Sequence, residues 1–200
     1  SDADTLYPLR DKGIRIPKLE DLLEYIVSLG DAAPTVYIEA KTAFEPRGIN
    51  CFGTPRPILD LIKKYKLEKK VTIQSFNPFC LIRFKNTDVG TMLIVPFLYG
   101  DRFVSGMHHS YIAPQYTDKS LDSDRVKKIH SAGKKIAVWS VNESTHIVDM
   151  IEIGVDAIMS DNPACVLLAD GRISGEINVY PDMLKVPLSV SVSNICADKS

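Results

Sequence analysis

Apolar positions along the chain alternate between the helical period and the extended period. Residues 19–27 place leucine, isoleucine and valine at the i, i+3, i+4 and i+7 spacing of an amphipathic helix, with Pro17 before it and Gly30 after it. A short apolar run that is typical of a strand follows at residues 36–40. The same order recurs, and we count six strand–helix units at a spacing of about 25 residues.

The other predicted strands are short apolar runs at residues 71–75, 90–95, 110–113, 135–141 and 156–160. The other predicted helices begin near a proline or a capping residue, and two of them end at a glycine: residues 55–65, 77–85, 122–132, 143–153 and a last one from 163. Residues 101–116 are harder to assign, and within them only the strand at 110–113, which Pro114 ends, is predicted.

Strands that alternate with helices predict right-handed crossovers and therefore a parallel sheet. Two α/β architectures fit this order: an open doubly wound sheet, or part of a (β/α)8 barrel. The last thirty residues break the rhythm, because Leu188, Val190 and Val192 alternate with serines in the pattern of a half-exposed strand. We therefore divide the chain into a domain at residues 1–170 and a C-terminal extension at 171–200.

Charge and composition exclude several classes of partner. Lys and Arg total 24 and Asp and Glu total 25, a net charge of -1, which gives no charge-driven attraction to nucleic acid or to an anionic membrane. No apolar run reaches the roughly 18 residues of a transmembrane segment. The chain begins with Ser1 and not with Met, which predicts a processed chain or a fragment.

Metal, redox and nucleotide motifs are not recognisable. The four cysteines form no C-x-x-C pair, so we expect no zinc site, and buried free thiols are favoured over disulfides. His108 and His109 are adjacent, and adjacent side chains on a strand point to opposite faces, so we do not expect them to share a metal ion. The sequence has no dinucleotide fingerprint, P-loop or nucleophile elbow.

The carboxyl ends of the predicted strands carry the candidate chemistry, because active sites of parallel α/β folds lie there. Glu39 alternates with Tyr37, so both point to one face of their strand. A carboxylate buried in so apolar a strand needs a cation, which is either a metal ion or Lys41 two residues on. Trp139, near another strand end, is either a core residue or the wall of a pocket.

Six segments in order resemble the signatures of glycerophosphodiester phosphodiesterases. The similarity extends over about 150 residues, roughly from Ile16 to Val166, and lies in the segments IPKLEDLL (16–23), YIEAK (37–41), TIQSF (72–76), HSAG (130–133), VWSVN (138–142) and GVDAIMSDNP (154–163). The resemblance implies a TIM-type (β/α)8 barrel that hydrolyses glycerophosphodiesters to glycerol 3-phosphate and an alcohol with a divalent cation, Ca2+ or Mg2+. By this resemblance Glu39 is a metal ligand, and Lys41, Trp139 and Phe76 bind the substrate.

The family's His-Arg, Glu-x-Asp and His-Asp motifs, which carry its acid/base histidines and further metal carboxylates, are absent from this sequence. We therefore expect six of eight barrel units and no catalytic histidine in this chain. One hypothesis is that the missing N-terminal segment is a separate chain. The alternative is a non-catalytic phosphodiesterase-like domain that binds a partner or a phosphorylated ligand.

Overall fold

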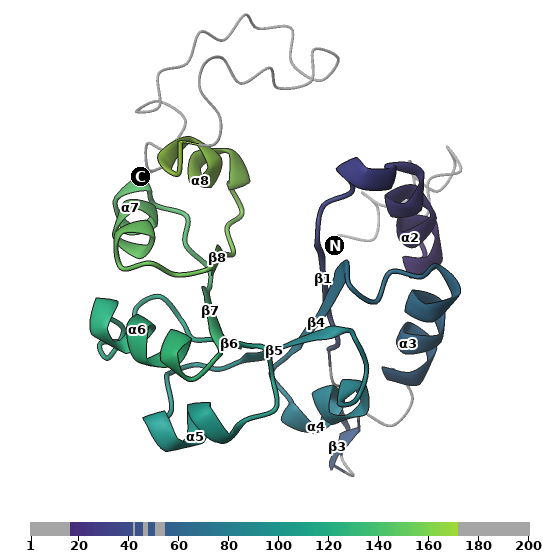
Figure 1. Cartoon of the computed structure of the whole chain (residues 1–200), viewed down its shortest axis with the longest axis horizontal. Helices are drawn as coiled ribbons and strands as arrows, with labels where there is room; N and C mark the ends of the chain where they lie inside the picture. Colours follow the sequence, from purple (N-terminus) through teal and green to yellow (C-terminus); the bar gives the residue numbers. More distant parts are fainter. Residues whose placement is uncertain (1–16, 42, 46–47, 51–54, 172–200) are drawn as a thin grey trace, which may run out of the picture.

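A computed structural model describes residues 17–41, 43–45, 48–50 and 55–171 of the chain. Six parallel strands form one curled sheet, half of a barrel, with the helices on its convex side (Figure 1). Their order in the sheet follows the chain: β1 (Val36–Glu39), β4 (Val71–Ser75), β5 (Gly90–Ile94), β6 (Tyr111–Ala113), β7 (Lys135–Val138) and β8 (Ala157–Ile158). The predicted α/β fold with a parallel, barrel-type sheet is thereby confirmed.

The helices match the predicted segments closely: α2 (Leu19–Ser28), α3 (Pro55–Lys64), α4 (Pro78–Leu81) with the 3-10 turn η2 (Ile82–Phe84), α6 (Ser123–Ser131), α7 (Ser144–Glu152) and α8 (Pro163–Ala169). A further 3-10 turn, η1 (Gly30–Ala32), follows α2. Asp122 caps α6 by accepting a 2.7 Å hydrogen bond from the Arg125 backbone amide. Gly133 and Gly154 follow α6 and α7 with φ of +70° and +86°, the left-handed conformation predicted from their positions.

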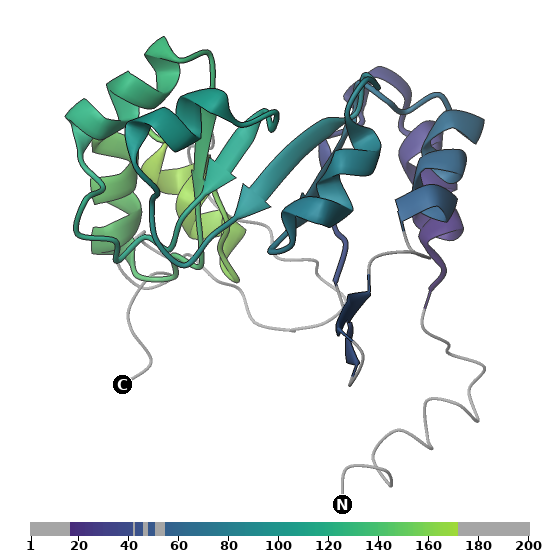
Figure 2. The same ribbon diagram turned by 90° about the horizontal axis from the view of Figure 1, so that it is seen from below.

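Two elements were not predicted. The short helix α5 (Asp101–Gly106) buries only Val104 and is too short to show a period, but Arg125 of α6 pairs with Asp101 and with the Tyr99 carbonyl. The antiparallel hairpin of β2 (Ala43–Glu45) and β3 (Gly48–Asn50) follows β1 and projects away from the helical layer (Figure 2). Strands β7 and β8 are shorter than the runs that predicted them.

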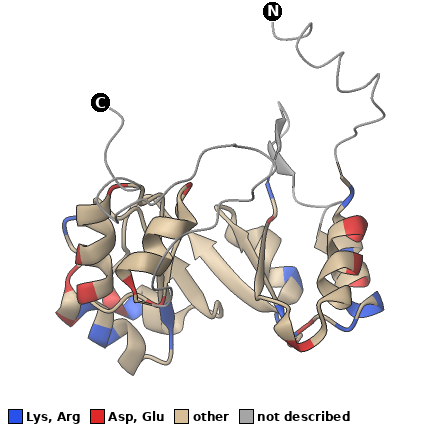
Figure 3. Ribbon diagram, turned by 90° about the horizontal axis from the view of Figure 1, so that it is seen from above, with Lys and Arg blue, Asp and Glu red and all other residues tan. Residues whose placement is uncertain are grey.

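The main core lies between the sheet and the helices. Side chains such as Ile73, Leu93, Ile112 and Ile136 point outward from successive strands and are 0–3% exposed beneath the helices. A smaller cluster, of Met92, Ile94, Ala113 and Ala137, packs on the concave side of the same strands. Charged residues gather on the helices, as Figure 3 shows, which agrees with a helical layer between the core and solvent.

The cysteine prediction was wrong. Cys80 and Cys165 are both buried and both disulfide-bonded, and neither thiol is free. Spacing along the chain does not reveal which sulfur atoms meet in space, and burial is equally typical of a free thiol and of a disulfide. Among the described residues, no helix is both long and apolar enough to cross a membrane. Residues 172–200 lie outside the described part, so the C-terminal extension with its strand stays a prediction.

Candidate functional site

The curl of the sheet brings together the ends of strands that are not neighbours. Phe76 follows β4 and Trp139 follows β7, with β5 and β6 between them in the sheet. Their ring centroids are nevertheless 5.4 Å apart, with the planes at 84°, an edge-to-face contact. This aromatic pair lies at the carboxyl edge of the sheet, where the sequence predicted the site.

Trp139 is held firmly in this position. Its indole Nε1 donates a 2.8 Å hydrogen bond to the Ala113 carbonyl at the end of β6, and its backbone forms a parallel bridge with Gln115. The side chain is half-buried, with its inner part on the concave cluster. Trp139 therefore packs against the core and presents its remaining surface at the edge of the sheet, and its role as a pocket wall stays a prediction.

The backbone around Phe76 is fixed by its two neighbours. The Ser75 hydroxyl donates a 2.8 Å bond to the Ala40 carbonyl and accepts a bond from the Asn77 amide, which ties the end of β4 to that of β1. The Asn77 side chain caps α4 by accepting from the Phe79 amide at 2.9 Å. Phe76 itself remains 52% exposed. A rigid backbone thus holds an apolar ring in contact with solvent.

Glu39 and Lys41 lie at the end of β1, next to this wall. Glu39 is opposite Gln74 of β4 in the parallel register. It alternates with Ile38, which packs against the outer core, so Glu39 lies on the concave side. Both Glu39 and Lys41 are exposed, and no ion pair joins them in the described part of the chain. Lys41 is therefore not the cation that pairs with Glu39. Because Glu39 is exposed, its carboxylate does not need a cation to offset burial.

Gln74 was missed by the sequence analysis. Its side-chain Oε1 is buried and has no hydrogen-bond partner among the described residues, although a buried acceptor without one is destabilising by about 1–3 kcal/mol. The alternation along β4 puts Gln74 on the same face as Phe76, and the register puts it beside Glu39. These two facts could have singled it out, because a polar side chain on an inner face next to a candidate ligand is unusual.

The concave side also carries a pair of tyrosines, farther from the carboxyl edge. Tyr37 of β1 and Tyr111 of β6 meet edge to face with centroids 6.2 Å apart, and Lys135 lies over the Tyr111 ring. Burial, with a smaller contribution from the Tyr111 hydroxyl, raises the pKa of Tyr37 to about 12. Tyr37 is therefore neutral near pH 7 and acts as a hydrogen-bonding and packing group.

The loops after β7 and β8 are joined by a third feature of this edge. The Asn142 amide nitrogen donates to an Asp161 carboxylate oxygen at 2.8 Å, while its oxygen accepts from the Asp161 backbone amide at 2.9 Å. The Ser160 hydroxyl donates to the same Asn142 oxygen. These contacts fix the second side of the edge, opposite the one formed by β1 and β4.

A curled parallel sheet with its helices outside and its polar and aromatic side chains at the carboxyl edge defines a protein of the (β/α)-barrel class. Comparison with known proteins then gives the family. Residues 2–165 match the Glycerophosphoryl diester phosphodiesterase family, and the chain belongs to this family. The resemblance stated from the sequence motifs is thereby confirmed.

Individual relatives agree with this assignment. The chain is 28% identical over 171 residues to the glycerophosphodiester phosphodiesterase of Caldanaerobacter subterraneus subsp. tengcongensis, covering 83% of this chain and 66% of that protein. Its fold is similar to that of a glycerophosphodiester phosphodiesterase from Parabacteroides distasonis, with a TM-score of 0.66, 22% identity and coverage of 78% and 65%. An Oleispira antarctica phosphodiesterase, solved with the product sn-glycerol-3-phosphate, gives a TM-score of 0.65, 19% identity and coverage of 78% and 62%. The chain thus spans slightly less than two thirds of the length of these relatives.

Proposed function

We propose that this chain forms part of a hydrolase that cleaves glycerophosphodiesters to glycerol 3-phosphate and an alcohol. The observation that supports this most directly is the exposed Glu39 carboxylate beside the Phe76–Trp139 pair, at the carboxyl edge of a chain that belongs to the family. The Oleispira antarctica relative, whose product is sn-glycerol-3-phosphate, supports the substrate class.

Each residue of the site has a proposed role. The Phe76 and Trp139 rings form an apolar wall against the carbon skeleton of the glycerol moiety and keep water from that side. The Lys41 ammonium attracts the phosphate, since an exposed Lys binds phosphate as a point charge. Tyr37, neutral near pH 7, lies on the same face of β1 as Glu39.

The donor atoms near Glu39 suit the divalent cation, Ca2+ or Mg2+, that the resemblance implies. Hard cations take oxygen ligands, and Glu39 would hold the ion through its carboxylate, with the unpartnered Gln74 Oε1 as a second oxygen beside it. The described residues hold no group of three His, Cys, Asp or Glu that could bind a metal, and from these residues we propose only Glu39 and Gln74 as oxygen donors. When bound, such a cation neutralises charge on the phosphate.

The test uses the chain with glycerophosphocholine as the substrate and follows the release of glycerol 3-phosphate with Ca2+, with Mg2+ and with EDTA. We expect Glu39→Gln to lower the metal-dependent rate at least about 100-fold, because it removes the only charged cation ligand proposed in this site. Glu152→Gln is the matched control, because Glu152 is exposed at the end of α7 on the outer layer, and we expect a wild-type rate.

The outcome separates this proposal from its alternative, a non-catalytic phosphodiesterase-like domain that binds a partner or a phosphorylated ligand. The lack of a three-residue metal cluster in the described residues favours that alternative. Binding of glycerol 3-phosphate in calorimetry without any turnover of the diester by this chain is the outcome that the alternative predicts. Turnover that Glu39→Gln leaves unchanged overturns the role of Glu39. Nothing in the structure or the comparisons supports a separate N-terminal chain.

A further inference from the structure

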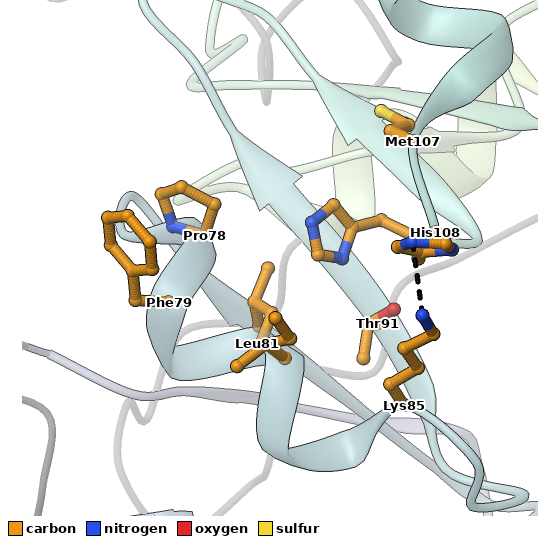
Figure 4. Close-up of a pocket in the computed structure, with 9 residues that line it drawn as sticks. Pro78, Phe79, Leu81, Lys85, Thr91, Met107 and His108 are labelled. Atoms are coloured by element: carbon orange, nitrogen blue, oxygen red, sulfur yellow. Dashed lines mark hydrogen bonds between the residues drawn. The ribbon is translucent and has the colours of Figure 1, made fainter.

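A hollow lies on the outer side of the sheet, among the helices. It has a volume of about 210 Å³ and is bounded by α4 and η2 on one side and by Met107, His108 and His109, which lead into β6, on the other (Figure 4). Thr91 of β5 forms its floor. Thr91 is opposite Ile73 in the register, and Ile73 belongs to the core beneath the helices. The outer pocket is therefore separate from the concave site.

The polar side chains of the outer pocket are the Thr91 hydroxyl and the nitrogen-bearing groups of Lys85, His108 and His109. Figure 4 shows the Lys85 amine directed toward His108, and Nζ lies 3.2 Å from Nε2 of that ring. An ammonium can only donate, so His108 Nε2 accepts in this contact. Burial, and then the nearby His108 and Lys134, lowers the pKa of His109, so the His109 ring is mostly neutral near pH 7.

Lys85 thus carries a positive charge that no lining group balances. The nine residues that line the outer pocket include no Asp or Glu, and no ion pair to Lys85 is found in the described part of the chain. Two imidazoles beside the ammonium add hydrogen-bonding capacity. An anion with a single charge matches this set.

The rest of the lining is apolar. Leu81 and Met107 are buried in the wall, at 1% and 9% exposed, while Phe79 and Ile82 are 72% and 55% exposed at the rim. Large apolar side chains that remain exposed around a hollow favour ligand binding, because covering them removes apolar surface from water and lowers the free energy. The ligand therefore needs an apolar body as well as its charge.

We propose that the outer pocket binds a small organic carboxylate, with the carboxylate on Lys85 and the imidazoles and the apolar body on Leu81, Ile82 and Met107. A hollow of about 210 Å³ suits a small ligand, such as a single ring with one carboxylate. A carboxylate carries one charge, as Lys85 does, whereas a phosphate monoester carries nearly two near neutral pH. This proposal does not rest on the proposed hydrolase activity.

Benzoate, with nine non-hydrogen atoms, is the probe, and its binding to the whole chain is followed by amide chemical shifts in a 1H–15N titration. We expect saturable binding with a Kd of about 1 mM, which matches the modest free energy available to so small a ligand. The shifts should be centred on Thr91 and on residues 107–109. Benzyl alcohol, which has the same ring without the charge, should bind at least about tenfold more weakly.

Lys85→Met keeps the apolar stem and removes the charge, and we expect it to weaken benzoate binding about tenfold or more. Lys69→Met, at an exposed lysine after α3, is the control and should leave the Kd unchanged. Three results would overturn the proposal: no saturable binding, equal binding of benzyl alcohol, or equal effects of the two variants. Shifts centred on Trp139 and Phe76 would place the ligand in the concave site and would overturn it as well.

Discussion

The two faces of the curled sheet differ in how much apolar surface they bury. On the outer face Ile73, Ile112 and Ile136 are completely buried beneath the helices. On the concave face the buried cluster is small, and two residues at the carboxyl edge remain exposed: Glu39, the last residue of β1, and Phe76, which follows β4. Most of the apolar burial that stabilises the fold is therefore on the outer face, and the concave face is free to carry side chains selected for chemistry.

The largest effect is expected from the outer face. Ile112→Ala removes a buried side chain at the centre of the main core and should lower the free energy of unfolding by about 3 kcal/mol, through lost burial and the cavity left behind. Urea denaturation measures the change. Val148→Ala, at a position 41% exposed on α7, is the control and should change stability by less than about 0.5 kcal/mol. Equal losses in the two variants would show that the outer face is not the main source of stability.

A smaller effect is expected where the concave face is crowded. A Cβ on Gly90 would lie 2.5 Å from the Thr72 hydroxyl, so Gly90→Ala should destabilise the fold by about 2 kcal/mol. Thr72→Ala in the same chain should recover part of this loss, because it removes the clashing oxygen. Gly106→Ala, where nothing lies within 4 Å of the new Cβ, is the control in the same denaturation experiment. Additive losses in the double variant would contradict the close approach of Gly90 to Thr72.

The smallest effect on stability is expected at the carboxyl edge. Phe76→Ala should lower the free energy of unfolding by less than about 1 kcal/mol, because the ring is 52% exposed, yet weaken glycerol 3-phosphate binding about tenfold in calorimetry. Phe103→Ala, on α5 and 50% exposed, is the matched control and should not change that affinity. If both variants bind equally well, the aromatic pair is not a ligand wall, and the contrast between the two faces is lost.

Much of the fold could be predicted because the signals were local. Gly133 and Gly154 end their helices where the pattern predicts, and β4 has the predicted bounds. The helix α5 could not be predicted, because it is too short to show a period and because Arg125, which contacts Asp101 and the Tyr99 carbonyl, is distant in the sequence. The disulfide bonds of Cys80 and Cys165 could not be predicted either, because the cysteines of this chain are far apart in the sequence.

The site was predictable in its position but not in its surroundings. Alternation placed Glu39 on the same face of its strand as Tyr37, and the structure shows that this is the concave face. The exposure of Glu39 depends on how far the sheet curls, which a local sequence pattern does not determine. The adjacent His108 and His109 were expected to face apart, as they would on a strand. They precede β6, where alternation does not apply, and both line the outer pocket.

The contact between Phe76 and Trp139 has a practical consequence for spectroscopy. Trp139 is the only tryptophan in the chain, so the intrinsic fluorescence excited at the red edge of protein absorption arises from one ring at one place. The Trp139 ring touches the Phe76 ring, although β5 and β6 lie between their two strands in the sheet. The fluorescence emission of Trp139 therefore reports on the curvature of the sheet without an added label. It can be followed in a stopped-flow instrument as the strand ends separate or as a ligand binds between them.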